Sequence, residues 1–374
     1  MSLYIGVMSG TSLDGIDISI VDFTTSNEWQ LIAAQTFPFP TDLHEKLFTL
    51  ITSQRCNLRE LGEVDIALGQ VTAQSINILL AKHQIDANDI SAIGSHGQTL
   101  FHAPNGDYPF SMQIGNGNVI AEQTGITTVA DFRQRDIAAH GQGAPLVPAF
   151  HSELFFSTQE DRVIINIGGI SNLTLLPANN NQAVTGFDTG PGNVLLDGWI
   201  QRHQQQSYDR QGQWAESGQC NDELLTNLLD EPYFQQAIPK STGRELFNLN
   251  WLDIKLEEFN KHISAVDVQA TLVQLTAHTI ALHIKDYLDS SKTIFVCGGG
   301  AHNDYLISRL EKLLANKTVT STESLGLHPD WVEACAFAWL AYKTINHQSG
   351  NMPAVTGACH SVVLGAIYAS SEVS

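Results

Sequence analysis

The sequence predicts an α/β fold built from two related halves, and three observations favour it. Apolar strand-like segments alternate with helical segments along the 374 residues, which is the pattern of an α/β architecture. Two predicted hairpins with small polar tips, one in residues 4–22 and one in residues 163–176, suggest that the architecture is repeated. The chain is also longer than the roughly 250–300 residues at which one hydrophobic core stops growing, so two domains are expected.

Each hairpin is predicted from its hydrophobic pattern. In the first, the apolar segment 4–8 and the alternating segment 16–22 flank Ser-Gly-Thr-Ser-Leu-Asp-Gly at residues 9–15. Alternation with a period of two indicates a strand, and Asp-Gly marks a tight turn. In the second hairpin, the apolar segments 163–167 and 173–176 flank a Gly-Gly-Ile-Ser-Asn tip.

The predicted elements divide into an N-terminal domain of residues 1–150, joined by a C-terminal helix at 358–374, and a C-terminal domain of residues 151–357. Residues 205–268, which are rich in Gln, Asn and Glu, are expected to form surface helices. The apolar positions in residues 360–369 suggest that the last helix returns to the first half. The other strands are expected at 91–95, 127–131, 183–187 and 293–297, and the other helices at 41–52, 64–84, 118–125, 193–204, 269–288, 303–314 and 333–345.

The composition excludes several classes of partner. With 19 Lys+Arg against 39 Asp+Glu, the chain has a formal charge of −20. Neither nucleic acid nor an anionic membrane is an expected partner, because both require a basic surface. A small anionic ligand is not excluded, because a local site can override the global field.

The sequence favours a cytoplasmic protein. The N-terminus has no basic region and no cleavage-site pattern, so no signal peptide is predicted. No segment approaches the ~18 apolar residues that a membrane span needs. The five cysteines contain no C-x-x-C pair, so reduced thiols are expected rather than disulfides or a zinc ribbon.

The tip of the first hairpin is a candidate phosphate-binding loop. Its glycines allow a phosphate to approach the backbone, and Thr11 and Ser12 can donate hydrogen bonds to its oxygens. Asp14 or Asp17 could hold a magnesium ion, directly or through water. The loop lacks the lysine of a Walker A motif, and a plain turn built from Ser, Asp and Gly is the alternative.

Two further glycine-rich turns could complete a nucleotide site. The tip at residues 168–172 could clamp a phosphate chain from the other side. Residues 298–301, Gly-Gly-Gly-Ala, follow an apolar strand directly. Consecutive glycines cost chain entropy, which suggests that a nucleotide base and ribose approach this backbone closely. Turn geometry alone is the alternative at both places.

Asp188 is the candidate general base. It follows the apolar strand 183–187 and precedes a Gly-Pro-Gly loop and a helix. It is therefore expected at the carboxyl edge of the sheet, where α/β proteins place their ligands. Asp188 could equally cap the following helix, although Asn193 or Thr189 could supply that cap and leave Asp188 available as a base.

Polar residues after two strands of the first half are candidates for sugar binding. His96, Gln98 and Thr99 come after one predicted strand, and Arg133 comes after the next. Their side chains suit sugar hydroxyls, and the guanidinium suits a carboxylate or amide oxygen. A loop histidine with local partners only, and an Arg–Asp salt bridge, are the alternatives.

Taken in order, these elements resemble the sugar kinase/actin-like ATPase superfamily, and within it the anhydro-N-acetylmuramic acid kinase family. The resemblance spans nearly the whole chain, and the runs Met-Ser-Gly-Thr-Ser-Leu-Asp-Gly and Phe-Asp-Thr-Gly-Pro-Gly-Asn are specific. Residues 205–262 carry little of it. The segments that carry it are 5–15, 94–99, 130–133, 141–148, 166–174, 186–193, 298–301 and 333–339.

The resemblance implies two actin-like or ribonuclease H-like domains around a central nucleotide-binding cleft, and a kinase that uses ATP and Mg²⁺. Its substrate would be 1,6-anhydro-N-acetylmuramic acid, whose anhydro ring is hydrolysed and whose O6 is phosphorylated. The products would be N-acetylmuramic acid 6-phosphate and ADP, formed in the recycling of peptidoglycan.

The same resemblance implies a role for each candidate residue. Asp188 would be the catalytic base, and Asp14 would be the magnesium ligand. Contacts to phosphate or nucleotide are implied for Gly10, Thr11, Ser12, Leu13, Asp14, Gly15, Ile16, Asp17, Gly168, Gly169, Ser171, Asn172, Gly298, Gly299, Gly300 and Ala301, and contacts to the sugar for His96, Gly97, Gln98, Thr99, Arg133 and Asp188.

Two other functions stay open at the level of sequence. An ordinary sugar kinase would need the same residues, with Asp188 deprotonating a free hydroxyl. An actin-like ATP-driven switch or chaperone would need a partner-binding region, for which 374 residues leave little room. The sequence also leaves homodimer formation open.

Overall fold

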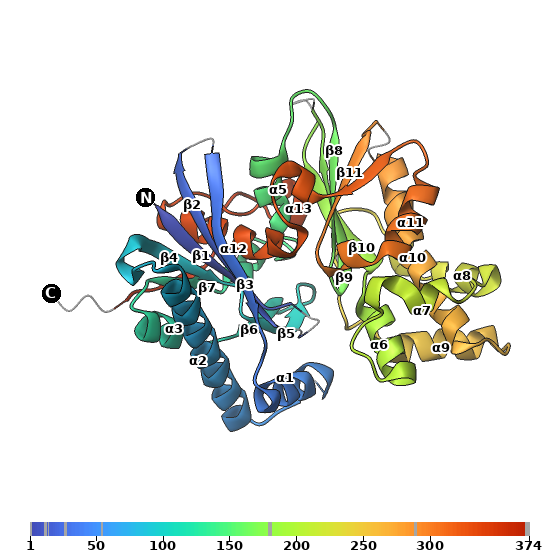
Figure 1. Ribbon diagram of the computed structural model, residues 1–374, viewed down its shortest axis with the longest axis horizontal. Helices are drawn as coiled ribbons and strands as arrows, with labels where there is room; N and C mark the ends of the chain where they lie inside the picture. Colours follow the sequence, from blue (N-terminus) through green and yellow to red (C-terminus); the bar gives the residue numbers. More distant parts are fainter. Residues whose placement is uncertain are drawn as a thin grey trace. The chain divides into compact units, whose positions relative to one another are not determined.

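The structure confirms the mixed α/β class and divides the chain into two compact units. The first unit comprises Met1–Phe150 and Trp331–Ser374, and the second comprises His151–Asp330. Each unit contains one large sheet with helices packed against it (Figure 1). The structure is a computed structural model that describes residues 2–10, 13, 15–25, 28–53, 55–178, 182–287 and 290–370.

The first unit is built on a six-stranded sheet with the order β13-β7-β4-β1-β2-β3. β1, β2 and β3 form an antiparallel meander, β4 runs parallel to β1, and β7 runs parallel to β4. β13 pairs antiparallel with β7 at the edge. These strands are β1 (Leu3–Met8), β2 (Ile16–Thr25), β3 (Glu28–Phe37), β4 (Ile90–Ser95), β7 (Thr128–Ala130) and β13 (Ala366–Tyr368).

The second unit repeats this arrangement in a five-stranded sheet with the order β10-β9-β8-β11-β12. Its first three strands form an antiparallel meander, and the next two run parallel to the first. Counted along each unit, the first five strands of both large sheets have the order 3-2-1-4-5, so the predicted relation between the halves is confirmed. The strands are β8 (Arg162–Ile167), β9 (Ile170–Leu176), β10 (Thr185–Pro191), β11 (Thr293–Cys297) and β12 (Thr318–Ser321).

Helix α12 packs closely on one face of the first sheet because two glycines leave room for it. Gly6 on β1 and Gly94 on β4 are neighbours in register. A Cβ at either position would overlap the carbonyl oxygen of Ala334 or Phe337 in α12. Alternate residues such as Ile5 point to the other face, into the core that α1 and α2 complete. The unit contains α1 (Thr41–Ser53), α2 (Leu58–His83), η1 (Ala87–Asp89), α3 (Gly117–Thr124), α4 (Phe132–Ala138), α12 (Val332–Ile345), α13 (Pro353–Thr356) and a separate sheet of β5 (Gln98–Ala103) and β6 (Phe110–Ile114).

Helix α2 is, within the described residues, the one helix long and apolar enough to cross a membrane by length and composition. This differs from the expectation that no segment approaches that length. Half of the apolar window is buried inside the protein, and Leu68, Ile76 and Leu79 pack in the core of the first unit. Helix α2 is therefore a core helix, and its composition follows from that position.

Residues 205–268, expected as surface helices, supply part of the second unit's core. Leu224, Tyr233, Phe247 and Leu252 are almost fully buried and pack in the same cluster as the strands. The unit contains α6 (Val194–Gln204), η2 (Arg210–Gly212), α7 (Gln213–Glu216), α8 (Asp222–Leu229), η3 (Pro232–Gln235), α9 (Leu249–Phe259), α10 (Ala265–Tyr287), η4 (Gly299–His302), α11 (Asp304–Leu313) and η5 (Thr322–Leu325), and the boundaries between the units fall in α5 (Val147–Phe155) and η6 (Pro329–Trp331).

The C-terminal part of the chain differs from the prediction in two ways. Residues 331–357 were expected in the second domain but cluster with the first unit, because α12 packs on β1 and β4. The helix predicted at 358–374 is wrong for the described residues. Residues 357–365 form neither helix nor strand, and Ala366–Tyr368 form β13. Strand pairing with β7 suits Ile367 and Tyr368, because β-branched and aromatic residues favour strands.

Candidate functional site

The tip of the first hairpin is described in part. Thr11, Ser12 and Asp14, which were predicted to bind phosphate or magnesium, lie outside the described residues. Leu13 has a φ of 59°, in the left-handed region that few residues other than glycine adopt. Its N–H donates to the carbonyl oxygen of Gly10 at 3.3 Å.

Three predicted residues at the start of β2 are held against the sheet. A Cβ on Gly15 would approach the carbonyl oxygen of Phe37 to 2.8 Å, so packing alone requires this glycine. The side chain of Ile16 is buried in the core, which leaves only its main chain for a ligand. Asp17 Oδ1 accepts a hydrogen bond from Thr36 Oγ1 at 2.6 Å.

A buried side-chain contact ties the first tip to β5. Ser9 Oγ donates to Gln98 Oε1 at 2.5 Å, and both side chains are buried. Gln98 was predicted to contact the sugar, but in this conformation its side chain holds Ser9. Gln113 Nε2 on β6 donates to Thr99 Oγ1 at 3.0 Å, which orients the next predicted sugar-binding residue.

His96 and Arg133, which were predicted together as candidates for sugar binding, form one hydrogen-bonded pair. His96 Nδ1 must donate to the carbonyl oxygen of Gly97 at 2.8 Å, because a carbonyl can only accept. Its Nε2 then accepts from Arg133 Nε and Nη2 at 3.1 and 2.9 Å. Burial, and then the charge of Arg133, lower the pKa of His96 to about 3, so His96 is neutral at pH 7 and can accept these bonds.

A second support of Arg133 comes from a loop that the sequence analysis did not single out for binding. Arg133 Nη1 donates to the carbonyl oxygen of Gly143 at 2.8 Å. The buried carboxylate of Asp136 accepts from Gly143 N–H, Asn351 Nδ2 and Thr356 Oγ1, each at 2.8 Å. Asp136 therefore fixes the support of Arg133 and links α4 to the C-terminal segment.

His102 on β5 is a further polar residue beside Arg133 that sequence reasoning missed. Its Nδ1 lies 3.0 Å from Ser111 Oγ on β6. Burial, and then the charge of Arg133, lower its pKa to about 4. The local sequence around His102 does not distinguish it from an exposed histidine on a strand. Only the pairing of β5 with β6 shows that His102 lies opposite Ser111.

The tip of the second hairpin is held by main-chain hydrogen bonds. The N–H groups of Gly192 and Val194 donate to the carbonyl oxygen of Gly169 at 2.9 and 3.0 Å, and that of Asn193 donates to Gly168 at 2.8 Å. A Cβ on Gly192 would overlap the carbonyl oxygen of Gly168. At Gly168 itself, the nearest atom to a Cβ would be 3.6 Å away. Packing does not require that glycine, which leaves close approach of a ligand as a reason for it.

Three polar side-chain atoms behind this tip are buried without a hydrogen-bond partner among the described residues. They are Asn166 Oδ1, Ser171 Oγ and Asn172 Oδ1, on two paired strands. An unsatisfied buried polar atom costs about 1–3 kcal/mol. Their concentration at a predicted phosphate-binding tip indicates that a water molecule or a bound group completes this part of the structure.

Packing explains two of the three glycines in the Gly-Gly-Gly-Ala turn. Gly298 has a φ of 78°, and a Cβ there would overlap Asn166 Oδ1. A Cβ on Gly300 would overlap the side chain of Ile167. These two glycines let the turn lie against the second hairpin, so they are no evidence for a ligand.

Gly299 is the glycine that packing does not explain. It is exposed, and the nearest atom to a Cβ there would be Asn193 Nδ2 at 3.8 Å. Asn193 therefore lies between the two glycine turns. It is the N-cap residue of α6, yet its side chain makes no capping bond and donates to the Ile167 carbonyl oxygen at 3.3 Å. Ala301 N–H is already bonded to the carbonyl oxygen of Gly298 at 2.9 Å.

Asp188 lies buried on β10, 6% exposed, at an irregularity in the pairing with β9. Its Oδ2 accepts from the N–H of Thr242 at 3.0 Å. Its main chain donates to the Lys240 carbonyl oxygen at 3.2 Å and accepts from Tyr233 Oη at 2.7 Å. Because Asn193 occupies the N-cap position of α6, the alternative that Asp188 caps this helix is excluded.

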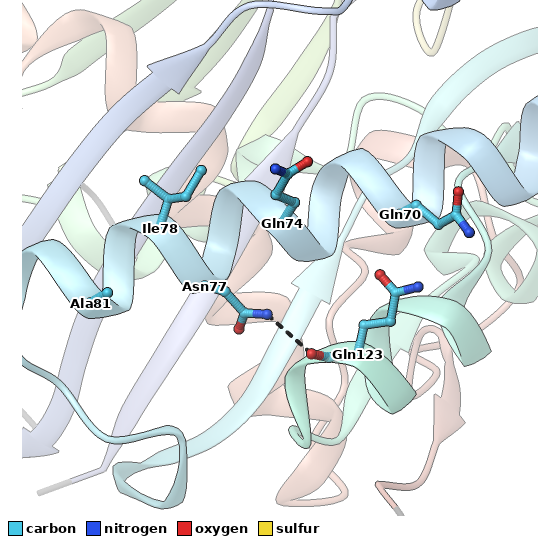
Figure 2. A pocket seen from close by; sticks show the side chains of 6 residues that line it. All are labelled: Gln70, Gln74, Asn77, Ile78, Ala81 and Gln123. Carbon is cyan, nitrogen blue, oxygen red and sulfur yellow. Dashed lines mark hydrogen bonds between the residues drawn. The ribbon is translucent and has the colours of Figure 1, made fainter.

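A surface hollow between α2 and α3 of the first unit is lined by none of the ionisable residues and glycine turns described above (Figure 2). Asn77 Nδ2 donates there to the main-chain oxygen of Gln123 at 3.0 Å. The lining residues are amides and aliphatic side chains, and none of the predicted site residues is among them: Gln70, Gln74, Asn77, Ile78, Ala81 and Gln123.

The repeated sheet topology and the two hairpins define a protein of two related α/β domains. The candidate base Asp188 lies within β10, whereas the sequence had predicted it after the end of that strand. The family model for anhydro-N-acetylmuramic acid kinase matches residues 2–370. The chain therefore belongs to the anhydro-N-acetylmuramic acid kinase family.

Named relatives agree with this family over almost their full length. The anhydro-N-acetylmuramic acid kinase of Pasteurella multocida is 52% identical over 98% of this chain and 96% of its own. That of Coxiella burnetii is 50% identical over 98% of this chain and 97% of its own. Among solved structures, component A of the (R)-2-hydroxyglutaryl-CoA dehydratase of Acidaminococcus fermentans is 12% identical, with a TM-score of 0.49, and the match covers 92% of this chain and 100% of that one. This last likeness is too low to bear on the site.

Proposed function

We propose that this chain is a cytoplasmic kinase that uses ATP to open the 1,6-anhydro ring of 1,6-anhydro-N-acetylmuramic acid and to phosphorylate O6. The products are N-acetylmuramic acid 6-phosphate and ADP, and the reaction serves peptidoglycan recycling. Membership of the family and identities of about half to relatives that carry this name support the proposal. Nucleic acid and membrane are not partners in it.

The observation that carries the mechanism is the environment of Asp188. Its carboxylate is buried, and Oδ2 accepts a main-chain hydrogen bond from Thr242. A hydrogen bond to the charged form favours that form, so the group is kept as the carboxylate that a general base must be before the reaction starts. Its place at an irregularity of β10 sets it apart from a side chain that only completes the core.

The proposed reaction begins with proton transfer from a water molecule to Asp188. The water oxygen bonds to C1, and the bond between C1 and O6 breaks with its electron pair on O6. O6 then bonds to the γ-phosphorus of ATP, and ADP leaves. The proton on Asp188 returns to solvent after the products dissociate. General-base catalysis of this kind contributes about 10²–10⁴-fold, and positioning supplies much of the rest.

The nucleotide is proposed to bind along the glycine turns of the second unit and the tip of the first. Gly168 and Gly299 are positions where a Cβ would meet no close neighbour, so the main chain can approach the nucleotide there. Gly169 keeps its proposed phosphate contact. Asn193, which lies nearest to Gly299 and bonds to Gly168, is added to the predicted set. Thr11, Ser12 and the other tip residues keep their proposed phosphate contacts.

Magnesium is part of the proposal, and the oxygen donors of the first tip suit it. Mg²⁺ is usually held by one or two carboxylates together with substrate phosphates and water. Within the ranges that the structure describes, no group of three or more His, Cys, Asp or Glu side chains is placed to hold a metal. Binding through phosphates is the arrangement that fits. Asp14 would hold the ion, which would neutralise phosphate charge.

The sugar is proposed to lie against His96, Gly97, Gln98, Thr99 and Arg133, with Asp188 at C1. The Arg133 guanidinium is held by neutral His96 and by a main-chain oxygen. It is the proposed contact of the lactyl carboxylate, because a guanidinium can bind both carboxylate oxygens. The acceptor His96 fixes its orientation.

The substrate is tested by incubating the purified protein and ATP with either the anhydro sugar or reducing N-acetylmuramic acid. Phosphorylation of the anhydro sugar with release of ADP is expected. Phosphate in the reducing sugar alone would show an ordinary sugar kinase. ATP turnover that ignores both sugars would favour an actin-like switch.

The base is tested by Asp188→Asn, which keeps the size of the side chain and removes the proton acceptor. Turnover should fall by about 10²–10⁴-fold, while ADP affinity measured by calorimetry stays within a few-fold. The matched control is Asp253→Asn, which changes an exposed carboxylate of the same unit paired with Arg202. Turnover of Asp188→Asn within tenfold of the parent would remove Asp188 from the mechanism.

A further inference from the structure

We infer that the segment from Tyr233 to Thr242 positions Asp188 for catalysis, and that Lys240 is the residue on which this positioning depends. The inference rests on the proposed function, in which Asp188 is the base. It assigns a role to part of residues 205–262, which carry little of the family resemblance.

The segment contacts Asp188 at three points. Tyr233 Oη donates to its carbonyl oxygen at 2.7 Å, and the Lys240 carbonyl oxygen accepts from its N–H at 3.2 Å. Thr242 N–H donates to Oδ2 at 3.0 Å. Two bonds fix the main chain on either side of the Cα, and the third fixes the rotation of the carboxylate. One short segment therefore sets both the place and the direction of the base.

Lys240 holds this segment in its conformation. Its side chain is 5% exposed, and Nζ donates to the carbonyl oxygens of Tyr233 and Phe234 at 3.2 and 3.3 Å. The same Nζ lies 4.7 Å from the centre of the Tyr233 ring, within the range of a cation–π contact. The ammonium thus bridges the two ends of the segment that grips Asp188.

Burying the ammonium group of Lys240 is energetically unfavourable, which argues against a merely structural role for this residue. Removing a charge from water costs several kcal/mol, and a well-packed apolar side chain often replaces a buried ion without loss of stability. Burial lowers the pKa of Lys240 to about 8, and the charge of Asp188 opposes that shift. By reciprocity, the ammonium favours the ionised form of Asp188.

Other ionisable groups surround this pair. The pKa of Tyr233 is raised by burial and then by the charges of Asp188 and Glu245, so its hydroxyl stays protonated and can donate. The pKa of Glu245 is raised by its own burial. Lys240 is the group whose positive charge interacts with Asp188 here, because the charge of Asp188 raises the pKa of Lys240.

The central experiment is the pH profile of kcat for Lys240→Met, which removes the charge and keeps the length of the stem. Removing a nearby positive charge raises the pKa of a carboxyl group, so the acid limb should move upward by about one pH unit. kcat at its maximum should fall by about tenfold, with KM for ATP within threefold. Ionisation of the substrates affects the pH profiles of all variants equally, so it does not contribute to the difference between them.

Two further variants separate charge from packing. Lys240→Arg keeps the charge, so its acid limb should stay within about 0.3 pH units of the parent even where its bulk lowers kcat. Tyr233→Phe removes the hydroxyl bond to Asp188 and keeps the ring, so kcat should fall about threefold to tenfold with KM and the acid limb unchanged. The matched control is Lys317→Met, because Lys317 also donates to a main-chain oxygen in this unit, that of Ser291 at 2.9 Å. Its kinetics should equal those of the parent.

The outcomes distinguish this inference from the proposed function. If Asp188→Asn abolishes turnover while Lys240→Met keeps the parental acid limb, Asp188 is the base and the role of Lys240 is refuted. If Asp188→Asn keeps turnover within tenfold of the parent, Asp188 is not the base, and the positioning role of Lys240 falls with that part of the proposed mechanism. If Lys240→Met loses ADP binding and has not folded, Tyr233→Phe decides, and parental kcat in that variant would overturn the positioning role.

Discussion

The two hairpin tips have similar compositions but are held in different ways. In the second unit, main-chain N–H groups from residues 192–194 bind the carbonyl oxygens of Gly168 and Gly169. In the described part of the first unit's tip, the side chain of Ser9 is bound by that of Gln98. The nearby Arg133 is held by neutral His96. Similar small polar tips are thus supported in two ways. The support of the second tip should be sensitive to a Cβ at Gly192, and that of the first to loss of a polar side chain and to pH.

The largest expected difference is in the response to acid, because the first unit's site depends on histidines that are neutral when folded. The pKa of His96 is lowered to about 3 and that of His102 to about 4. In the unfolded chain these two histidines bind protons below about pH 6.5, whereas in the folded chain they bind them only at much lower pH. The unfolding free energy that depends on these neutral histidines is therefore fully present above about pH 6.5 and is lost as the pH falls. Together the two sites should remove about 4 kcal/mol by pH 5.

Urea denaturation at several pH values between 7.5 and 5 tests this expectation. His102→Gln should make the loss of unfolding free energy on acidification shallower, by about 1.4 kcal/mol per pH unit below pH 6. His83→Gln, which removes an exposed histidine at the end of α2, is the control. Equal pH slopes for His102→Gln and the parent would show that His102 is not held neutral.

The next largest effect should come from a methyl group at the second tip. Gly192→Ala places a Cβ against the carbonyl oxygen of Gly168, and main-chain atoms cannot move aside as a side chain can. A loss of about 1–3 kcal/mol in unfolding free energy is expected. Gly168→Ala, where the nearest atom is 3.6 Å away, should fold like the parent and lower only ADP affinity. Equal stability of the two variants would contradict the proposed main-chain support.

The smallest effect should come from Ser9→Ala in the first unit. The substitution removes one buried hydrogen bond and leaves Gln98 Oε1 unsatisfied. The unfolding free energy should fall by about 1–3 kcal/mol, and by about 1 kcal/mol if a water molecule replaces the hydroxyl. Ser53→Ala, which removes an exposed bond to Arg55, should cost less than about 0.5 kcal/mol. If Ser9→Ala matched Ser53→Ala in urea midpoint, the first tip would not depend on its side chains.

Local sequence was sufficient for four strands, for the long helix α10 and for the glycine turns. Apolar segments predicted β1, β8 and β9, alternation with a period of two predicted β2, and the helical pattern predicted α10. It was not sufficient for β3, β5, β6, α4, α5 and β12, which are edge strands or short helices whose limits depend on their neighbours. The tail shows the same limit, since β13 forms only because β7 offers an unpaired edge.

The sequence by itself determined that this protein is α/β, that its halves are related, and which aspartate is the candidate base. These properties follow from patterns within a few residues and from runs specific to one family. Only the tertiary structure decided that α12 packs in the first unit, that His96 and Arg133 form a pair, and that Tyr233, Lys240 and Thr242 grip Asp188. The contact between His96 and Arg133 joins residues 37 positions apart, and that between Asp188 and Thr242 joins residues 54 positions apart. No local pattern encodes which distant donor meets a given acceptor, because that depends on the packing of the whole unit.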